Sequence, residues 1–411
     1  MNDPQSEPGN GHQIAARKRG FLQQVIQRKR LESLFLFVTS RCNSKCRTCF
    51  YHAKLNDGRD LSFAAIERLA DTAGQFAKLW LSGGEPTMRE DLAEVIELFY
   101  HRCGIKVVNF PSNGLLPERV EQVLAHLLER CPKLELHVNF SLDGIGETHD
   151  AIRGVPGGFR KTLATIAAVR RRFGAEPRVV MNVASVVTPE NYDELFDLGA
   201  YLLERDLVGA HVFEITRGDP RDPTTKALSA RQMLDLYDRV YPLFELQGER
   251  LFKDFGPIGR RVANTFFLGF IRFMQELQGA NVDGPCDWGM ACTAGRTTIV
   301  VDHDGQFRAC EMRPPIGDLR EYGYDIGAAL RSAAMRSEIT AIGGGSRANC
   351  WCTHGCWIMS SMKFSPRTLL GRLPAAYLRS RRLHQPDFRL PQLDPGRIAR
   401  YEATLDARAA E

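Results

Sequence analysis

Three cysteines stand within eight residues of one another, in the sequence RCNSKCRTCFY. Cys42, Cys46 and Cys49 have the spacing C-x3-C-x2-C and directly follow an apolar run that predicts a strand. A [4Fe–4S] cluster normally takes four cysteines, so three thiolates on one loop can bind three irons and leave the fourth iron open to another ligand. A structural zinc ion completed by His52 is the alternative, because zinc prefers four ligands in a tetrahedron.

Polar residues follow two further predicted strands. Residues 82–86, SGGEP, place two glycines and the Glu85 carboxylate at a strand end, where the glycines allow close backbone approach and the carboxylate suits an ammonium group. Residues 141–144, SLDG, end another strand, and the Ser141 hydroxyl together with the Arg153 guanidinium suits a free carboxylate. Each motif alone is also common in ordinary turns. One ligand that carries both an amine and a carboxylate would satisfy both sites.

These motifs need a scaffold that brings several strand ends together. Residues 33–218 alternate between apolar runs, rich in β-branched and aromatic residues, and stretches with helical periodicity. Ser62 is a predicted N-cap, and another helix is predicted from Ser229 to about Gly248. Six strand–helix units in succession predict a parallel sheet with helices outside it, and therefore chemistry at the carboxyl ends of the strands. The predicted strands are SLFLFVTS, AKLWLSGG, KVVNFPSNG, ELHVNFSLDG, RVVMNVASVV and GAHVFEITRG.

In these motifs the sequence resembles the radical S-adenosylmethionine (radical SAM) superfamily. The resemblance is carried by the three cysteines, GGEP at 83–86, SNG at 112–114 and SLDG with the downstream Arg153, in that order over about residues 33–218. It implies a partial (β/α)6 TIM-like barrel, a [4Fe–4S] cluster, and S-adenosylmethionine chelated to the open iron. An electron from a flavodoxin or ferredoxin-type donor then cleaves the sulfonium, and a 5′-deoxyadenosyl radical abstracts hydrogen from the substrate.

The same resemblance assigns residues to the cofactor. Gly83, Gly84 and Glu85 would hold the methionyl amine, and Ser141 and Arg153 the carboxylate. Met181 and Asn182, on the fifth predicted strand, would lie near the nucleoside. The sequence departs from the family before the third cysteine, where an aromatic residue usually covers the adenine. Here the residue is Thr48, so we expect Phe50 or Tyr51 to take that role.

A second group of cysteines occupies the last third of the chain. It resembles the SPASM and twitch extensions of radical SAM enzymes, which hold auxiliary [4Fe–4S] clusters, although only a C-x3-C tail of the full SPASM pattern is present. We predict one auxiliary cluster. Its ligands in order of preference are Cys292 and Cys310, joined by a hairpin, then Cys356, with Cys286 and Cys352 competing for the fourth place and Cys350 as a spare thiol. A zinc site built from the same residues is the alternative.

We therefore predict an α/β barrel followed by a smaller, cysteine-rich α+β domain. The leading function is radical chemistry on a small-molecule or carbohydrate-like substrate. A SPASM-type peptide maturase is the second, although residues 1–32 are too few for a peptide-binding domain. A zinc-bound binding module is the non-enzymatic alternative. The predicted segments are a basic extension 1–32, the barrel 33–248, a helical Phe-rich linker 249–284, the auxiliary domain 285–365 and a basic tail 366–411.

Composition and charge limit the partners. The 411 residues are 44% apolar and 25% charged with net charge +5, which is typical of globular proteins and too small a bias to indicate nucleic acid. No signal peptide or run of 18 apolar residues is evident, so we expect a cytoplasmic protein.

Residues 17–30 carry six basic groups and no acid. Together with the Phe-rich segment 251–278, which more commonly forms core, they raise peripheral contact with anionic membrane and a lipid or lipid-linked glycan substrate as a third alternative.

Overall fold

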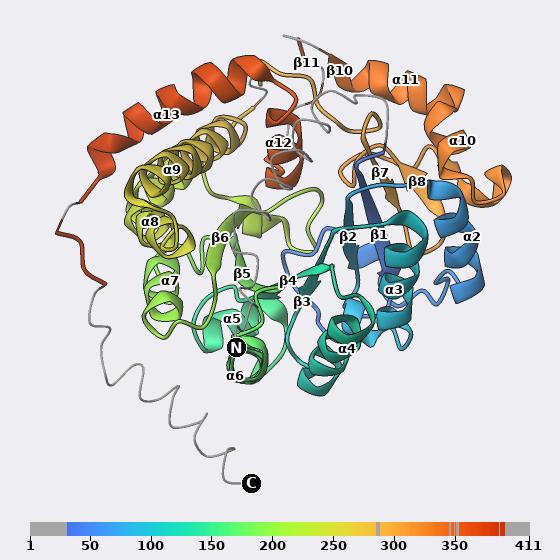
Figure 1. The fold of residues 1–411 in the computed structure, drawn as a ribbon, viewed down its shortest axis with the longest axis horizontal. Helices are drawn as coiled ribbons and strands as arrows, with labels where there is room; N and C mark the ends of the chain where they lie inside the picture. Colours follow the sequence, from blue (N-terminus) through green and yellow to red (C-terminus); the bar gives the residue numbers. More distant parts are fainter. Residues whose placement is uncertain are drawn as a thin grey trace, which may run out of the picture.

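One sheet of nine strands runs through the part of the chain that the structure describes (Figure 1). The computed structural model describes residues 31–284, 288–344, 347–348, 350, 353–385 and 387–390. The first six strands are parallel and adjacent in chain order, which confirms the predicted partial barrel. They are β1 (Ser33–Thr39), β2 (Lys78–Gly83), β3 (Val107–Ser112), β4 (Glu135–Ser141), β5 (Val179–Val187) and β6 (Ala210–Ile215).

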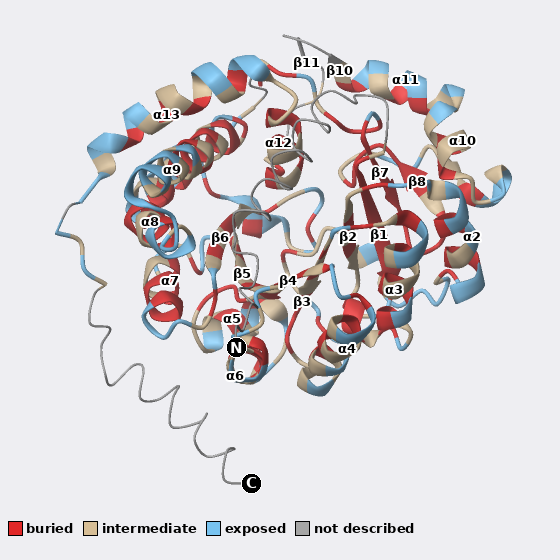
Figure 2. Ribbon diagram, in the orientation of Figure 1, coloured by how far each residue is buried: buried red, intermediate tan, exposed pale blue. Residues whose placement is uncertain are grey.

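Helices cover the outer face of this sheet (Figures 1 and 2). Along β4 the apolar residues Leu136, Val138 and Phe140 are fully buried, while the alternate residues are half-buried. Because strand side chains alternate between faces, the apolar set packs under the helices and the polar set lines the inside of the barrel. The helices are α2 (Phe63–Ala73), α3 (Leu92–Cys103), α4 (Pro117–Arg130), α5 (Glu147–Arg153), α6 (Gly158–Phe173) and α7 (Leu195–Glu204).

Two helices begin where the sequence predicts, and the predicted N-cap Ser62 is confirmed. The Ser62 side chain accepts a hydrogen bond from the backbone of Ala65 at the start of α2. Ser229 forms a capping box with Gln232 at the start of α8 (Ala230–Leu251). Each cap satisfies backbone N–H groups that have no partner within the helix.

The Phe-rich segment forms α9 (Pro257–Ala280), packed beside α8. The prediction that this segment forms core is confirmed for some of its residues. Phe273 is buried, whereas Phe266 is 48% exposed. None of the described helices has both the length and the apolar composition of a membrane span.

The C-terminal part continues the barrel sheet. The predicted hairpin is present as β7 (Thr298–Val301) and β8 (Gln306–Arg308), followed by β9 (Gly317–Asp318). Strand β7 pairs in parallel with β1, so the cysteine-rich segment is joined to the barrel through backbone hydrogen bonds. Its helices are α10 (Ile326–Arg331), α11 (Ala333–Ile342), α12 (Gly355–Met362) and α13 (Leu373–Ser380).

Helix α12 stands between the α8–α9 pair and strands β1 and β2 (Figure 1). The Trp357 ring stacks on Phe35 of β1, which in turn stacks on Trp80 of β2, each pair with centroids 5.3 Å apart. The auxiliary segment therefore packs directly against the inside of the barrel.

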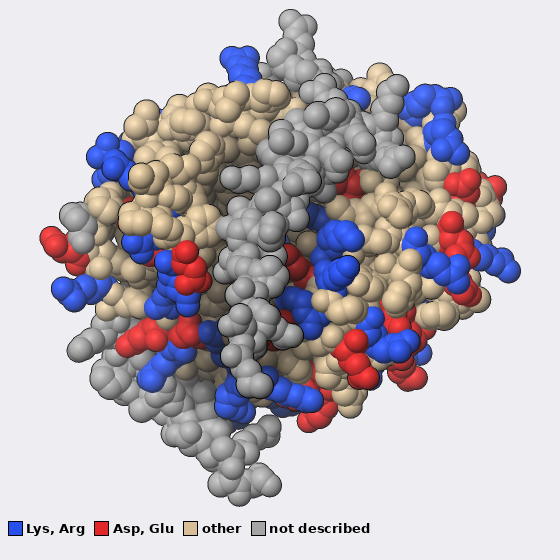
Figure 3. All heavy atoms as spheres, in the orientation of Figure 1, with Lys and Arg blue, Asp and Glu red and all other residues tan. Residues whose placement is uncertain are grey.

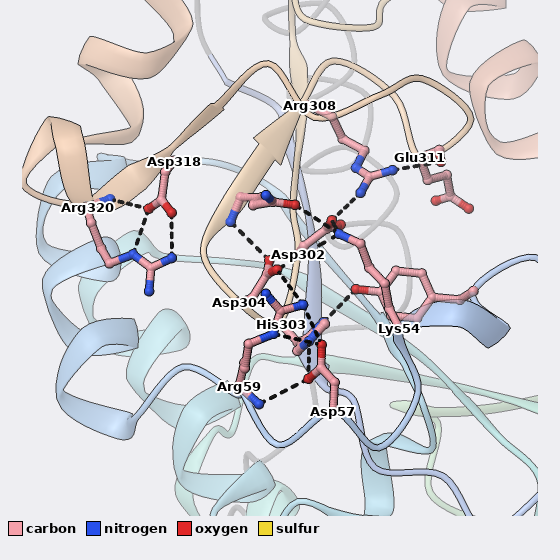
Figure 4. A network of polar contacts seen from close by, with 12 residues as sticks. Lys54, Asp57, Arg59, Asp302, His303, Asp304, Arg308, Glu311, Asp318 and Arg320 are labelled. Carbon is pink, nitrogen blue, oxygen red and sulfur yellow. Dashed lines mark hydrogen bonds and ion pairs between the residues drawn. The ribbon is translucent and has the colours of Figure 1, made fainter.

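A polar network fastens the segment after the cysteine loop to the β7–β8 turn (Figure 4). Lys54 Nζ donates to Asp302 Oδ2 at 2.7 Å, and Arg308 donates to the same carboxylate. His303 contacts the Tyr51 hydroxyl at 2.6 Å and Asp57 Oδ1 at 2.8 Å. These pairs join residues about 250 positions apart in the sequence, so the cysteine loop and the C-terminal hairpin form one unit.

Replacing Asp302 by Asn is expected to destabilise this unit. The carboxylate is fully buried, and its loss would leave Lys54 and Arg308 without their shared anion. The free energy of unfolding, measured by urea denaturation under argon, should fall by about 3 kcal/mol. The control is Asp235→Asn on α8, where the side chain is 64% exposed. A loss no larger than that of the control would contradict a structural role for the network.

Candidate functional site

The loop that carries Cys42, Cys46 and Cys49 is held by backbone hydrogen bonds on both sides. The amides of Lys45 and Arg47 donate to the carbonyls of Arg153 and Ile152, at 3.1 and 2.8 Å. On the other side, the Arg221 amide donates to the Cys49 carbonyl at 3.0 Å. The three thiols are thereby presented where β1 ends, between the end of α5 and the loop after β6.

The three thiols influence one another electrostatically. Burial, with a smaller contribution from the neighbouring Cys46, raises the pKa of Cys42 to about 12 and that of Cys49 to about 11. Among the described residues, however, these sulfurs do not all lie within 4.8 Å of one another, with or without His52. Ligands of one tetrahedral zinc ion at about 2.3 Å would be closer together than this. Three thiolates on one loop offer ligands for three irons of a cluster.

The double glycine at the end of β2 allows close approach to the cysteine loop. The Gly84 amide donates to the Thr39 carbonyl and the Glu85 amide to the Arg41 carbonyl, both at 2.8 Å. A Cβ atom at Gly84 would overlap the Arg41 carbonyl oxygen, and Gly83 has φ of +127°. Only glycine fits here, because β2 and the loop are in direct backbone contact.

Glu85 is held by protein donors. One carboxylate oxygen accepts from the Thr87 hydroxyl at 2.6 Å, and the other accepts from the Asn113 amide at 2.7 Å. The side chain is buried, which raises its pKa, and these hydrogen bonds oppose that rise. It therefore links the ends of β2 and β3 beside the thiols. Its role in binding the amine stays a prediction.

Arg153 lies beside the cysteines. Its Nε is 2.6 Å from Asp143 Oδ2, and its Nη1 is 3.7 Å from Cys46 Sγ. Burial lowers the pKa of Arg153, but the charges of Asp143 and Cys46 outweigh burial and raise it above its ordinary value. A guanidinium fixed next to the thiols is placed to meet a carboxylate ligand of a cluster. Ser141, the last residue of β4, lies two positions before Asp143 and on the same face of the strand as Asn139.

Asn182 belongs to a ladder of amides that the sequence analysis missed. Its Nδ2 donates to Asn139 Oδ1 at 3.2 Å, and Asn139 donates in turn to Asn109. The three side chains come from neighbouring strands and line the interior, whereas Met181 is buried on the opposite face. Nothing in their spacing along the chain connects these residues, because they meet only through strand register.

Two aromatic residues after Cys49 have different environments. Tyr51 is buried, and its hydroxyl contacts His303. Phe50 is half-buried and lies against Gly218 and beneath the Arg217 guanidinium, 5.9 Å from the ring centroid. Of the two predicted adenine covers, Phe50 is the one that faces the end of β6, while Tyr51 is engaged in the polar network.

The second cysteine group is only partly described. Cys286 and Cys352 lie outside the described residues. Cys350 lies close enough to raise the pKa of Cys292. Both Cys350 and Cys310 contribute to raising the pKa of Arg313. Cys350, predicted as a spare thiol, therefore lies near Cys292, one of the two preferred ligands.

Cys356 has other neighbours. Burial raises the pKa of Cys356 to about 12. The charged groups that also influence this pKa are Glu214, Arg217 and Glu311. It also lines a small hollow with Lys78 of β2. The thiol therefore faces the barrel side of α12, and its place among the auxiliary ligands stays a prediction.

A cavity of about 390 Å³, here called the β6 cavity, opens at the ends of β5 and β6. Its walls combine barrel residues, such as Val187 and Arg217, with Met312 and His354 from the C-terminal part. Sequence reasoning named no functional residue within 217–227. The available signal was their position directly after a parallel strand, where ligands commonly bind.

Comparison with known proteins agrees with this geometry. Residues 36–202 match the radical SAM superfamily profile. The chain is 35% identical to the "Probable GTP 3',8-cyclase" of Methanothermobacter thermautotrophicus, over 68% of this chain and 84% of that protein. It is 30% identical to the sporulation killing factor maturation protein SkfB of Bacillus subtilis, over 74% and 67%. A shorter match, 27% identical, covers 39% of this chain but only 38% of the pre-heme d1 synthase of Dinoroseobacter shibae.

Solved structures share the fold. The structure of native anSMEcpe with bound AdoMet and Kp18Cys peptide superposes with a TM-score of 0.56 at 18% identity, covering 84% of this chain and 99% of that chain. The cofactors that define the family are a [4Fe–4S] cluster and S-adenosylmethionine, and the three thiols, the glycine contact and Arg153 fit that pair. On its profile match and its curated relatives, the chain belongs to the radical SAM superfamily.

Proposed function

We propose that this enzyme uses a 5′-deoxyadenosyl radical to abstract hydrogen from a small molecule bound in the β6 cavity. The observation that carries the proposal is the cavity itself, since about 390 Å³ lies in the range of sites for small ligands. It adjoins the cysteine loop, because Gly218 in its wall packs against Phe50. When bound, the cluster and S-adenosylmethionine supply the reductive cleavage that generates the radical.

The protein's own contribution is to position groups and exclude water. Arg153 would bind the methionyl carboxylate next to Cys46, with Ser141 nearby, and the close contact of Gly83 and Gly84 would expose backbone groups to the amine. Asn182 and its amide ladder would offer hydrogen bonds to the nucleoside. Helix α12 stacks on β1 through Trp357 and contacts α9, and this cover would shield a radical from solvent.

An auxiliary [4Fe–4S] cluster is also proposed. The influence of Cys350 on the pKa of Cys292, and of Cys350 and Cys310 on that of Arg313, supports these three cysteines as ligands. Cys286, Cys352 and Cys356 are the candidates for the fourth. Electrons would come from a flavodoxin or ferredoxin-type donor. A reducing compartment such as the cytoplasm suits iron-bound thiolates, and we propose it for this enzyme.

Peptide maturation is the second candidate function. The match to SkfB, a maturation protein, covers two thirds of that protein at 30% identity, which favours this alternative. The size of the β6 cavity favours a small molecule, because a peptide needs a longer groove. Assays with both substrate classes separate the two.

A variant with Cys42, Cys46 and Cys49 all changed to Ala tests the cluster assignment. After anaerobic reconstitution it should hold about four fewer irons than the wild type and about four in total. With dithionite and S-adenosylmethionine, the wild type should form 5′-deoxyadenosine and the variant should form none. Unchanged iron content, or zinc in place of iron, would contradict the assignment.

Gly84→Ala tests the contact between β2 and the cysteine loop. The added Cβ would displace the loop backbone at Arg41, so binding of S-adenosylmethionine, measured by equilibrium dialysis, should weaken at least about tenfold. Gly256→Ala is the matched control, because its Cβ meets nothing within 4 Å and its φ of −56° suits alanine. Equal affinity in both variants would show that the contact does not position the cofactor site.

Membrane contact is a further proposal. Around the α8–α9 turn, Leu251, Ile258 and Val262 are 63%, 82% and 53% exposed, next to Lys253 and Arg261. Charges of both signs surround the face shown in Figure 3, so any attraction to lipid must be local.

Co-sedimentation with anionic vesicles tests this contact. Binding should be measurable at low salt, weaken at high salt because of screening, and fall when Ile258 is changed to Ser. Absence of binding at low salt would exclude the contact.

A further inference from the structure

The charged groups that line the β6 cavity are all basic. Arg217 follows β6, and Lys226 ends the short helix η3 (Pro223–Lys226) nearby. No Asp or Glu is found among the described residues that line the cavity. Lys226 Nζ donates to the Gly218 carbonyl at 2.8 Å, a neutral acceptor. The walls therefore favour a ligand with negative charge.

His354 and Glu311 fix the orientation of the Arg217 side chain. The shortest contact of its Nη1 with the His354 ring is 2.6 Å, to Nδ1. A guanidinium has only donors, so Nδ1 accepts and the Nε2–H faces Glu311 Oε1 at 3.0 Å. His354 and Glu311 are both buried. This chain of contacts fixes the orientation of the guanidinium.

Two further contacts bracket the Arg217 side chain. Its guanidinium lies over the Phe50 ring at 5.9 Å, and Glu214 Oε2 is 3.9 Å from Nη1. Phe50 directly follows the cluster ligand Cys49. The guanidinium therefore lies at the boundary between the cysteine loop and the cavity, where it can meet an oxyanion of a substrate close to the radical source.

The rest of the cavity is largely apolar. Its described walls include Val187, Leu228, Met233, Val282 and Met312. A ligand that fits them has a hydrocarbon or aromatic body attached to its charged group.

We infer that the β6 cavity binds a carboxylate with an apolar body, and that Arg217 anchors the carboxylate. Lys226 adds long-range attraction, and His354 with Glu311 positions Arg217. This inference rests on the proposed function, since it specifies the substrate class of the same cavity.

Isothermal titration calorimetry of the reconstituted, full-length protein tests the inference with 4-phenylbutyrate as the probe molecule. The matched probes are 4-phenylbutan-1-ol and 4-phenylbutylamine, which share its body. The carboxylate should bind at least about tenfold more tightly than the alcohol, because charge-assisted hydrogen bonds are the stronger class. The amine should bind more weakly than the alcohol.

Arg217→Gln should weaken 4-phenylbutyrate binding about tenfold and leave the alcohol unaffected. Arg217→Lys should recover part of the loss, because charge returns without the planar fork. Arg231→Ala is the control, since that side chain is 93% exposed on α8. If Arg217→Gln does not fold, Arg217→Lys and Lys226→Met supply the same comparison.

Equal affinity for carboxylate and alcohol, unchanged affinity in the Arg217 variants, or no binding of any probe would each overturn the inference. Calorimetry does not require S-adenosylmethionine cleavage. Failure of the wild type to form 5′-deoxyadenosine would therefore count against the proposed function and leave the binding result to be judged separately.

Discussion

Backbone hydrogen bonds to the cysteine loop are the constraint on which the rest of the structure depends. Three thiols can share one cluster only if the loop between them has a fixed shape, and short loops do not fix their own shape. Here the end of α5, the end of β2 and the loop after β6 each contribute such a bond. The glycine pair at 83–84 follows from this arrangement, since side chains there would separate β2 from the loop.

The two faces of the barrel sheet differ in polarity because they contact different partners. One face of each strand packs under helices and is apolar, while the other face must receive a cofactor that carries an amine, a carboxylate, hydroxyls and a base. The alternation along β4 and the amide ladder through Asn139 meet both requirements with the same strands. The stacked rings of Trp357, Phe35 and Trp80 then close one side of this interior with an apolar surface.

Local pattern predicted most of the barrel. Strand periodicity located all six parallel strands, and residue type and position identified the N-cap Ser62 and the helix that begins after Ser229. The cysteine spacing and the strand-end motifs predicted a common site, and the structure brings Arg153 to Cys46. All of these features depend on residues close together in the chain or on strand ends that share one edge.

The features that sequence reasoning missed depend on long-range contacts. Arg217 and His354 are 137 positions apart, and no local pattern connects them. The influence of Cys350 on Cys292 joins residues 58 positions apart, and the pairing of β7 with β1 depends on sheet register. The surroundings of Cys356 also come from distant parts of the chain, since Glu214, Arg217 and Glu311 are the charged groups that influence its pKa.

Electron paramagnetic resonance of the reduced, reconstituted protein, recorded with and without S-adenosylmethionine, tests the central claim most directly. The account predicts a reduced [4Fe–4S] signal whose shape changes when S-adenosylmethionine is added to the wild type. The change should be absent when Cys42, Cys46 and Cys49 are all Ala. A wild-type spectrum that does not respond to S-adenosylmethionine would contradict the claim that these three thiols hold a cluster with an open iron.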